Sequence, residues 1–212
     1  MTNYTKILLL SLAFIFIKTS TMAQSSITFD ASQVFSNFRF TDSKGTLDKN
    51  YSSNISGSYN LGYRYSGTSG LLLRSSIGMR KAGATLVYDG SNYAWNLQYV
   101  DIKLGAGYLY DAGRFSPYLT ASPYFSYLLK ANQILNNSNY DIKKSNSIKD
   151  TDYGVFITPG VQTKVSENIS AYAEFNYIMG LQNIETSSNG QKGYNRAYAV
   201  TVGVSISLSG KK

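Results

Sequence analysis

The chemistry open to this sequence is limited by the residue types that it lacks. The chain has 12 Asp and Glu and 20 Lys and Arg, but no Cys and no His. Thiolate and imidazole metal sites, disulfides, Ser–His and Cys–His nucleophile pairs and His general bases are therefore excluded. Carboxylates, amines and guanidinium groups remain, and we predict a protein with no catalytic activity, no metal and no cofactor.

Seven charged side chains share the polar face of segments whose other face is apolar. On that face they could line a narrow polar path, hold an acid–base pair, or neutralise one another. Because charges removed from water are costly unless they are paired, we expect a mutually neutralising plug, in which Glu174 is the best carboxylate partner for an arginine. The seven residues are Asp30, Arg64, Arg74, Arg80, Asp101, Lys103 and Glu174.

Two weaker motifs predict no site. Asp141, Asp150 and Asp152 offer oxygen ligands of the kind calcium uses, but their spacing matches no calcium loop and lysines lie among them, so we expect solvated charges. Gly105 and Gly107 resemble half of a dinucleotide fingerprint. They fall inside an alternating segment and begin no helix, and we interpret them as glycines that let a sheet close tightly.

Alternation of apolar and small polar residues recurs after residue 24 and predicts strands. In the last such segment Tyr198, Val200 and Val202 lie on one face, while Thr201 and Gly203 lie on the other. The sequence therefore predicts an all-β protein. Eight segments follow this pattern, at 25–40, 55–66, 71–81, 96–110, 117–130, 153–165, 169–181 and 196–208.

The connections between these segments alternate in length. Long polar connections fall at 41–54, 82–95, 131–152 and 182–195, and short turns at 67–70, 111–116 and 166–168. This alternation is typical of an eight-stranded antiparallel up-and-down transmembrane β-barrel, which we predict. Its apolar face, with Tyr59, Leu73, Phe175 and Val202, would meet lipid, and its polar face would line the lumen. The alternative is a soluble lipocalin-like barrel, which turns its apolar face inward around a ligand.

The first 23 residues have the pattern of an export signal. An apolar run too short to span a bilayer follows Lys6 and ends before Lys18, and a polar stretch then ends in Thr21-Met22-Ala23. We expect cleavage after Ala23, leaving residues 24–212 as a single barrel domain that begins at Gln24. Removal of the two lysines lowers the formal charge from +8 to +6, and because no basic block remains, we expect no nucleic-acid partner.

Four short motifs carry a resemblance to a known family. The segment 97–104, LQYVDIKL, resembles the "Y-(L/V)-(E/D)-I-P-L" strand of the PorT-like outer-membrane β-barrel proteins, common among Bacteroidetes. Segments 116–124, 175–184 and 202–206 are similar to that family's fifth, seventh and eighth strands. The resemblance implies a barrel in the bacterial outer membrane, and it implies no particular activity, because the activities of most members are unassigned.

The expected function is that of a small outer-membrane barrel whose lumen is filled by side chains. Its external loops would face the cell surface and its termini the periplasm. Expected partners are outer-membrane lipid, lipopolysaccharide phosphates contacted by Lys and Arg, and a surface or envelope protein. The alternative is a narrow transporter or an accessory barrel of a secretion machine.

Overall fold

The computed structural model describes residues 24–186 and 190–208. Eight long strands and two short ones, β2 (Leu47–Asp48) and β7 (Ser138–Asp141), make up its regular structure. Within these ranges no helix is long and apolar enough to cross a membrane. The predicted leader, 1–23, lies outside the described residues, so its cleavage stays a prediction. The long strands are β1 (Gln24–Thr41), β3 (Ser52–Ser66), β4 (Leu71–Tyr88), β5 (Ser91–Leu109), β6 (Phe115–Leu135), β8 (Thr151–Lys164), β9 (Ile169–Gly180) and β10 (Lys192–Ser207).

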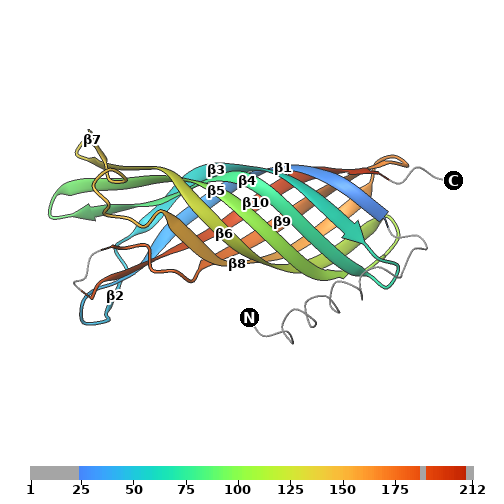
Figure 1. Cartoon of the computed structure of the whole chain (residues 1–212), viewed down its shortest axis with the longest axis horizontal. Helices are drawn as coiled ribbons and strands as arrows, with labels where there is room; N and C mark the ends of the chain where they lie inside the picture. The colour runs from blue at the N-terminus through green and yellow to red at the C-terminus, as the bar shows by residue number, and fades with distance from the viewer. Residues whose placement is uncertain (1–23, 187–189, 209–212) are drawn as a thin grey trace, which may run out of the picture.

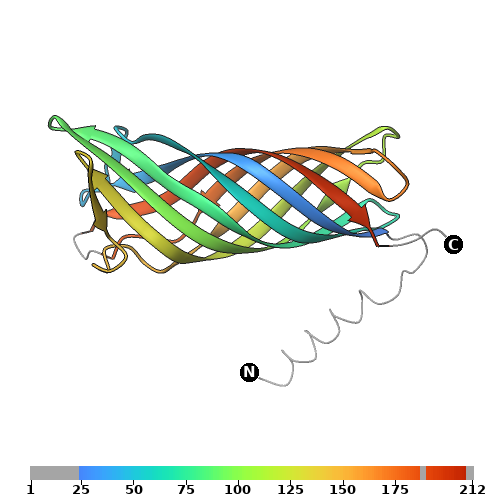
Figure 2. The ribbon, with the colours of Figure 1, turned by 90° about the horizontal axis from the view of Figure 1, so that it is seen from above.

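The sheet closes on itself as a barrel. Each long strand pairs antiparallel with the next one in sequence, and β1 pairs with β10 from Ser26↔Ser207 to Thr41↔Lys192. Figures 1 and 2 show the resulting cylinder, with tilted strands and the longer connections gathered at one end. We call this the loop end; the opposite end, where β1 begins and β10 ends, is the turn end. The predicted eight-stranded antiparallel barrel is confirmed.

The two faces of the wall follow the predicted phase. Tyr59, Phe175 and Val202 point outward and are 71%, 46% and 63% exposed, whereas Thr201 points inward and is 2% exposed. Leu73 is half-buried on the outer face. The alternative of a lipocalin-like barrel is therefore wrong, because the apolar side chains surround the barrel instead of filling it. A closed sheet with this outer surface satisfies its backbone amides in hydrocarbon.

Two of the predicted long loops, 82–95 and 131–152, are shorter than expected, because strands extend into them. β4 and β5 stay paired up to Tyr88↔Ser91, joined by Asp89 and Gly90 with φ of 48° and 71°. β6 likewise continues to Leu135 and turns back into β7 through a pair of asparagines with positive φ. Asp, Asn and Gly tolerate the left-handed region that a two-residue hairpin requires, so these polar residues make tight turns.

A bulge in β6 changes which side chains enter the lumen near the loop end. Gln98 pairs with Lys130 and Tyr99 pairs with Leu128, so Leu129 is an extra residue in β6. Leu128 is fully buried inside the barrel, while Leu129 is 39% exposed. The extra residue shifts the alternation of β6 by one position, so that Ala131 faces inward and is 1% exposed. The interior of the loop end is apolar as a result.

Candidate functional site

The lumen holds all seven charged residues predicted to share the polar face. Three of them are arginines. Arg64 lies on β3, and Arg74 and Arg80 lie on β4. The carboxylates come from strands on other parts of the wall, because Asp30 lies on β1 and Glu174 on β9. Asp101 and Lys103 lie on β5, two residues apart and therefore on the same face.

Glu174 is the centre of the ionic contacts nearest the turn end. Its Oε1 accepts a hydrogen bond of 2.6 Å from Arg74 Nη1 and another of 2.6 Å from Tyr118 Oη. Arg64 Nη2 lies 3.6 Å from the same oxygen. The side chain of Glu174 is only 4% exposed, so these contacts replace water as its solvation.

Arg64 lies between two tyrosine rings. Its guanidinium carbon is 4.9 Å from the ring centre of Tyr118 and 4.7 Å from that of Tyr172. Arg64 Nη1 also donates a hydrogen bond of 2.6 Å to Gln162 Oε1. Because the rings stack on a desolvated cation, they hold Arg64 in place across the lumen.

A second ionic group surrounds Arg80, closer to the loop end. Arg80 Nε donates to Asp101 Oδ2 at 2.7 Å, and Arg80 Nη2 lies 3.9 Å from Asp152 Oδ2. Ser126 Oγ donates to Asp101 Oδ1 at 2.7 Å. Asp152 accepts further hydrogen bonds of 2.9 Å from Tyr124 Oη and from the side-chain amide of Asn195.

Asp152 is the charged residue that the sequence interpretation missed. It was expected among solvated loop charges, and that expectation is wrong, because β8 begins at Thr151 and its second residue points inward. The Asp152 side chain is fully buried. Its phase was readable from the sequence, since Asp152 shares the alternation of Gly154, Phe156 and Thr158.

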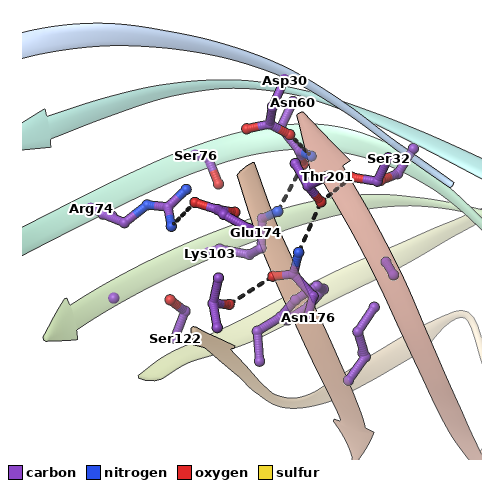
Figure 3. A pocket seen from close by; sticks show the side chains of 16 residues that line it. Asp30, Ser32, Asn60, Arg74, Ser76, Lys103, Ser122, Glu174, Asn176 and Thr201 are labelled. Atoms are coloured by element: carbon purple, nitrogen blue, oxygen red, sulfur yellow. Dashed lines mark hydrogen bonds and ion pairs between the residues drawn. The ribbon is translucent and has the colours of Figure 1, made fainter. Parts of the chain in front are cut away.

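Asp30 and Lys103 are linked through an amide in the middle of the barrel. Asn60 Nδ2 donates to Asp30 Oδ1 at 2.6 Å, while Lys103 Nζ donates to Asn60 Oδ1 at 2.8 Å. Tyr172 Oη donates to Asp30 Oδ2 at 3.0 Å. Asp30, Asn60 and Lys103 border a polar cavity of about 30 Å³, across which Arg74 reaches Glu174 (Figure 3). A cavity of that size holds about two water molecules.

The charged side chains in the lumen, taken together, form one group in which positive and negative charges balance. It contains four cations and four carboxylates, so its formal charge is zero. We call it the lumen network. Its members are Asp30, Arg64, Arg74, Arg80, Asp101, Lys103, Asp152 and Glu174.

An apolar cluster covers the lumen network at the loop end. Ile142, Ile148 and Ile184 come from the loops and pack on inward-facing strand residues such as Phe38 and Leu128. The loops are tied together, because the Lys149 amide donates to Ile184 O at 2.8 Å. We call this cluster the loop-end cap. Its buried members are Phe38, Ala82, Ala84, Leu97, Tyr99, Leu128, Ala131, Ile142, Ile148 and Ile184.

The side chain of Asp141, in the same loop region, makes local contacts. Asp141 Oδ1 accepts a hydrogen bond of 3.1 Å from the Lys144 amide, and Asp141 Oδ2 lies 3.5 Å from Lys144 Nζ. Those contacts lower the pKa of Asp141 below its ordinary value. Across residues 24–186 and 190–208, no group of three or more possible ligands is placed to hold a metal ion.

Comparison of the sequence with known families places it in one of them. The profile of the family described as "Outer membrane protein beta-barrel domain" matches residues 22–186. The chain belongs to this outer-membrane β-barrel family. Its place is therefore the bacterial outer membrane, and its outward apolar face is a transmembrane surface. No curated protein matches the chain in sequence.

Solved structures of small outer-membrane barrels share the fold of this family member. Neisserial surface protein A (NspA) is similar with a TM-score of 0.55 and 17% sequence identity, over 89% of this chain and 100% of NspA. OprG from Pseudomonas aeruginosa is similar with a TM-score of 0.51 and 8% identity, over 88% of this chain and 98% of OprG. At these identities the likeness establishes the fold.

Proposed function

We propose that this outer-membrane barrel is closed to ions and solutes and acts through its loop end, by binding surface or envelope partners. One observation carries the proposal. The lumen is filled by the charge-balanced lumen network and, at the loop end, by the apolar loop-end cap. A passage would require ions to displace paired, desolvated charges and then to cross packed Phe38 and Leu128. Both steps are costly, because the charges of the lumen network already have polar partners and the packed apolar side chains of the cap cannot replace the water around an ion.

The loop end also offers a surface suited to contacts. The β4–β5 and β6–β7 hairpins lie at this end, and the β4–β5 hairpin reaches furthest along the barrel axis (Figure 1). Val87 and Tyr88, at the tip of the first hairpin, are 70% and 64% exposed. Exposed aromatic and aliphatic side chains on rigid hairpins are typical of protein contacts.

Conductance measurements test whether the lumen is closed. Purified protein is reconstituted in planar lipid bilayers, and its folding is verified by the gel mobility difference between unheated and heated forms. We expect no discrete conductance steps. Regular openings from verified, folded protein would overturn the closed-lumen proposal and favour the narrow transporter or secretion accessory.

The proposal also places the loop end at the cell surface and the termini in the periplasm. Because the chain contains no Cys, a single introduced cysteine can be labelled without background. Lys44 and Arg114 are exposed cations at the loop end and the turn end. A membrane-impermeant maleimide should label Lys44→Cys and leave Arg114→Cys unlabelled in intact cells; the reverse pattern would overturn the orientation.

We further infer that the chain is a PorT-like member of its family. The support is that the residues carrying the resemblance act together, since Asp101 pairs with Arg80 and the Tyr99 ring centre lies 5.1 Å from the Arg80 guanidinium carbon. Aligned PorT-like sequences test the inference. They should combine the tyrosine and the acidic residue with a cation at the position of Arg80, and lack of that cation would contradict it.

A further inference from the structure

A groove of about 570 Å³ runs along the outer wall near the loop end, on the opposite side of the wall from the lumen network. It lies where β1, the β2 segment, β9 and β10 come together. Three cations line it, Arg39, Lys49 and Arg196, together with one carboxylate, Asp48. The groove therefore has an excess of two positive charges.

Strand pairing makes two of these cations diagonal neighbours on the outer face of the barrel. Arg196 on β10 lies opposite Asn37 on β1, and Arg39 is the next outward residue along β1. Both arginines follow the outward phase, because Tyr198 and Phe35, two and four residues away, are 53% and 38% exposed on the outer face. Arg39 and Arg196 consequently face the membrane side of the wall.

The apolar length of β10 gives the depth of Arg196 relative to the bilayer. Outward residues from Tyr198 to Leu208 are apolar and exposed. Ten residues span about 33 Å along a strand, or about 25 Å of height at a tilt near 40°, which is the usual height of the lipid-facing band. Arg196 is the next outward position, so it lies at the depth of lipid headgroups.

Three aromatic side chains stack on the outer wall beside Arg196, on its turn-end side; we call Phe175, Tyr177 and Tyr198 the aromatic shelf. The Tyr198 ring stacks on Tyr177 at 5.3 Å between ring centres and on Phe175 at 5.8 Å. Aromatic side chains gather where hydrocarbon meets headgroups. The shelf therefore separates an apolar surface for acyl chains from a cationic surface for headgroups.

Arg196 has hydrogen-bonding capacity that the protein does not use. Its Nη1 atom is buried and has no hydrogen-bond partner. Among the described residues, no carboxylate lies within 4.0 Å of a charged nitrogen of Arg39, Lys49 or Arg196. Burial raises the pKa of Tyr51, which also lines the groove, to about 12, so Tyr51 stays neutral. An unpartnered guanidinium nitrogen is costly, and an anion would satisfy it once the Arg196 side chain turns that nitrogen toward the groove.

We propose that this groove binds the phosphate group of a phosphorylated glycolipid in the outer leaflet. Arg39 and Arg196 donate to the phosphate oxygens, Lys49 adds a third positive charge, and the acyl chains lie along Tyr198 and the valines below it. Guanidinium groups suit this role because they bind phosphate with two parallel hydrogen bonds. The choice of an outer-leaflet lipid rests on the proposed orientation, with the loop end at the cell surface.

Native mass spectrometry of the folded protein in detergent micelles tests the site. The probe is bisphosphorylated lipid A, compared with the same lipid after removal of its phosphates. We expect the phosphorylated form to bind the wild-type protein at least tenfold more tightly. Arg196→Gln and Arg39→Gln should each weaken that binding about tenfold, since hydrogen bonds between charged groups are lost.

Arg114→Gln is the matched control. Arg114 is also an exposed arginine beside an aromatic ring, with its guanidinium carbon 5.6 Å from the ring centre of Phe115, but it lies at the turn end. Its replacement should leave lipid A binding unchanged. Gel mobility of unheated samples verifies that every variant is folded.

Three outcomes would overturn the site. These are equal binding of the dephosphorylated lipid, equal weakening by Arg114→Gln, and displacement of the lipid by millimolar inorganic phosphate, which would mean that the groove recognises a free anion. Failure of the site is distinguishable from failure of the proposed orientation. Reversed cysteine labelling would overturn the orientation and the outer-leaflet lipid together, whereas normal labelling without lipid A binding would overturn the site alone.

Discussion

Arg74 Nη1 donates a hydrogen bond of 2.6 Å to Glu174 Oε1 across the lumen, between residues that are 100 positions apart in the sequence. The contact joins β4 to β9, which are not neighbours in the sheet. It therefore ties opposite parts of the wall together through the interior. Arg80 has different partners, Asp101 and Asp152, so the lumen network contains two ionic groups.

The separation into two ionic groups predicts that Glu174 is energetically coupled to Arg74 and not to Arg80. Glu174→Gln should lower the free energy of unfolding in lipid vesicles by about 3 kcal/mol, because it leaves buried cations without their carboxylate. Arg74→Met in the same chain should recover part of that loss. Urea unfolding of the two single variants and the double variant gives the coupling energy, which we expect to exceed about 1 kcal/mol.

The matched control replaces the other arginine. Arg80→Met combined with Glu174→Gln should give additive effects, since Arg80 pairs with Asp101 instead. Coupling of equal size for Arg74 and Arg80, or none for Arg74, would contradict two separate ionic groups.

A cation on the lipid-facing wall should be harmful only at membrane depth. Val202→Arg should prevent folding into vesicles or cost about 2–4 kcal/mol, because it places a charge in hydrocarbon. Val87→Arg is the control, since Val87 is similarly exposed, at 70% against 63%, but lies at the tip of the β4–β5 hairpin. Vesicle folding yields and urea midpoints measure both, and equal damage would show that the hairpin tip is also immersed.

Thr201, the inward neighbour of Val202, is no suitable control for that experiment. Its hydroxyl bonds to Ser32 at 2.7 Å and accepts a hydrogen bond of 2.8 Å from Asn176. An arginine there would disrupt both contacts and bring an unpaired charge into a filled interior.

Removal of an aromatic ring from the loop-end cap should be costly and visible by fluorescence. Trp95 is the single tryptophan of the chain, and its ring centre lies 6.0 Å from that of Phe38. Phe38→Ala should lower the free energy of unfolding by about 3–5 kcal/mol and shift Trp95 emission to longer wavelength, as a cavity admits water. Tyr88→Ala, at the exposed hairpin tip, should change both quantities little; an unchanged spectrum for Phe38→Ala would contradict a packed cap.

The loop-end cap should loosen as pH rises above the ordinary pKa of glutamate. Glu185 follows Ile184 of the cap in the sequence, and burial raises the pKa of Glu185 above 4.5, so the folded loop favours the protonated carboxyl. The folded state then binds more protons than the unfolded state, and stability present below pH 4.5 falls as pH rises through the higher folded pKa. Hydrogen-exchange protection of the Lys149 amide, bonded to Ile184 O, should decrease over that range.

Glu185→Gln supplies the control for this pH effect. The amide has a similar shape and does not ionise, so protection of the Lys149 amide should become independent of pH in that variant. Protection that increases with pH in the wild-type protein would contradict a destabilising charge at Glu185.

Alternation with period two is sufficient to predict the barrel from the sequence, because it shows which side chains share a face before any contact is known. Tyr59, Phe175 and Val202 lie outside and Thr201 inside, as the alternation predicts. Local turn chemistry was also present in the sequence. Asp89 and Gly90 favour a two-residue hairpin, which explains why the connection predicted at 82–95 is much shorter in the structure.

The pairing of charges and the filling of the loop end depend on tertiary contacts, which the alternation of residues does not contain. Alternation places Arg74, Arg80 and Glu174 on one face, but which of them meet depends on barrel closure, strand tilt and stagger, which no single strand contains. Burial of Ile142, Ile148 and Ile184 likewise follows from loops folding onto the lumen and from the bulge at Leu129. A strand's faces are fixed by local geometry, whereas a contact across the lumen depends on the whole closed sheet.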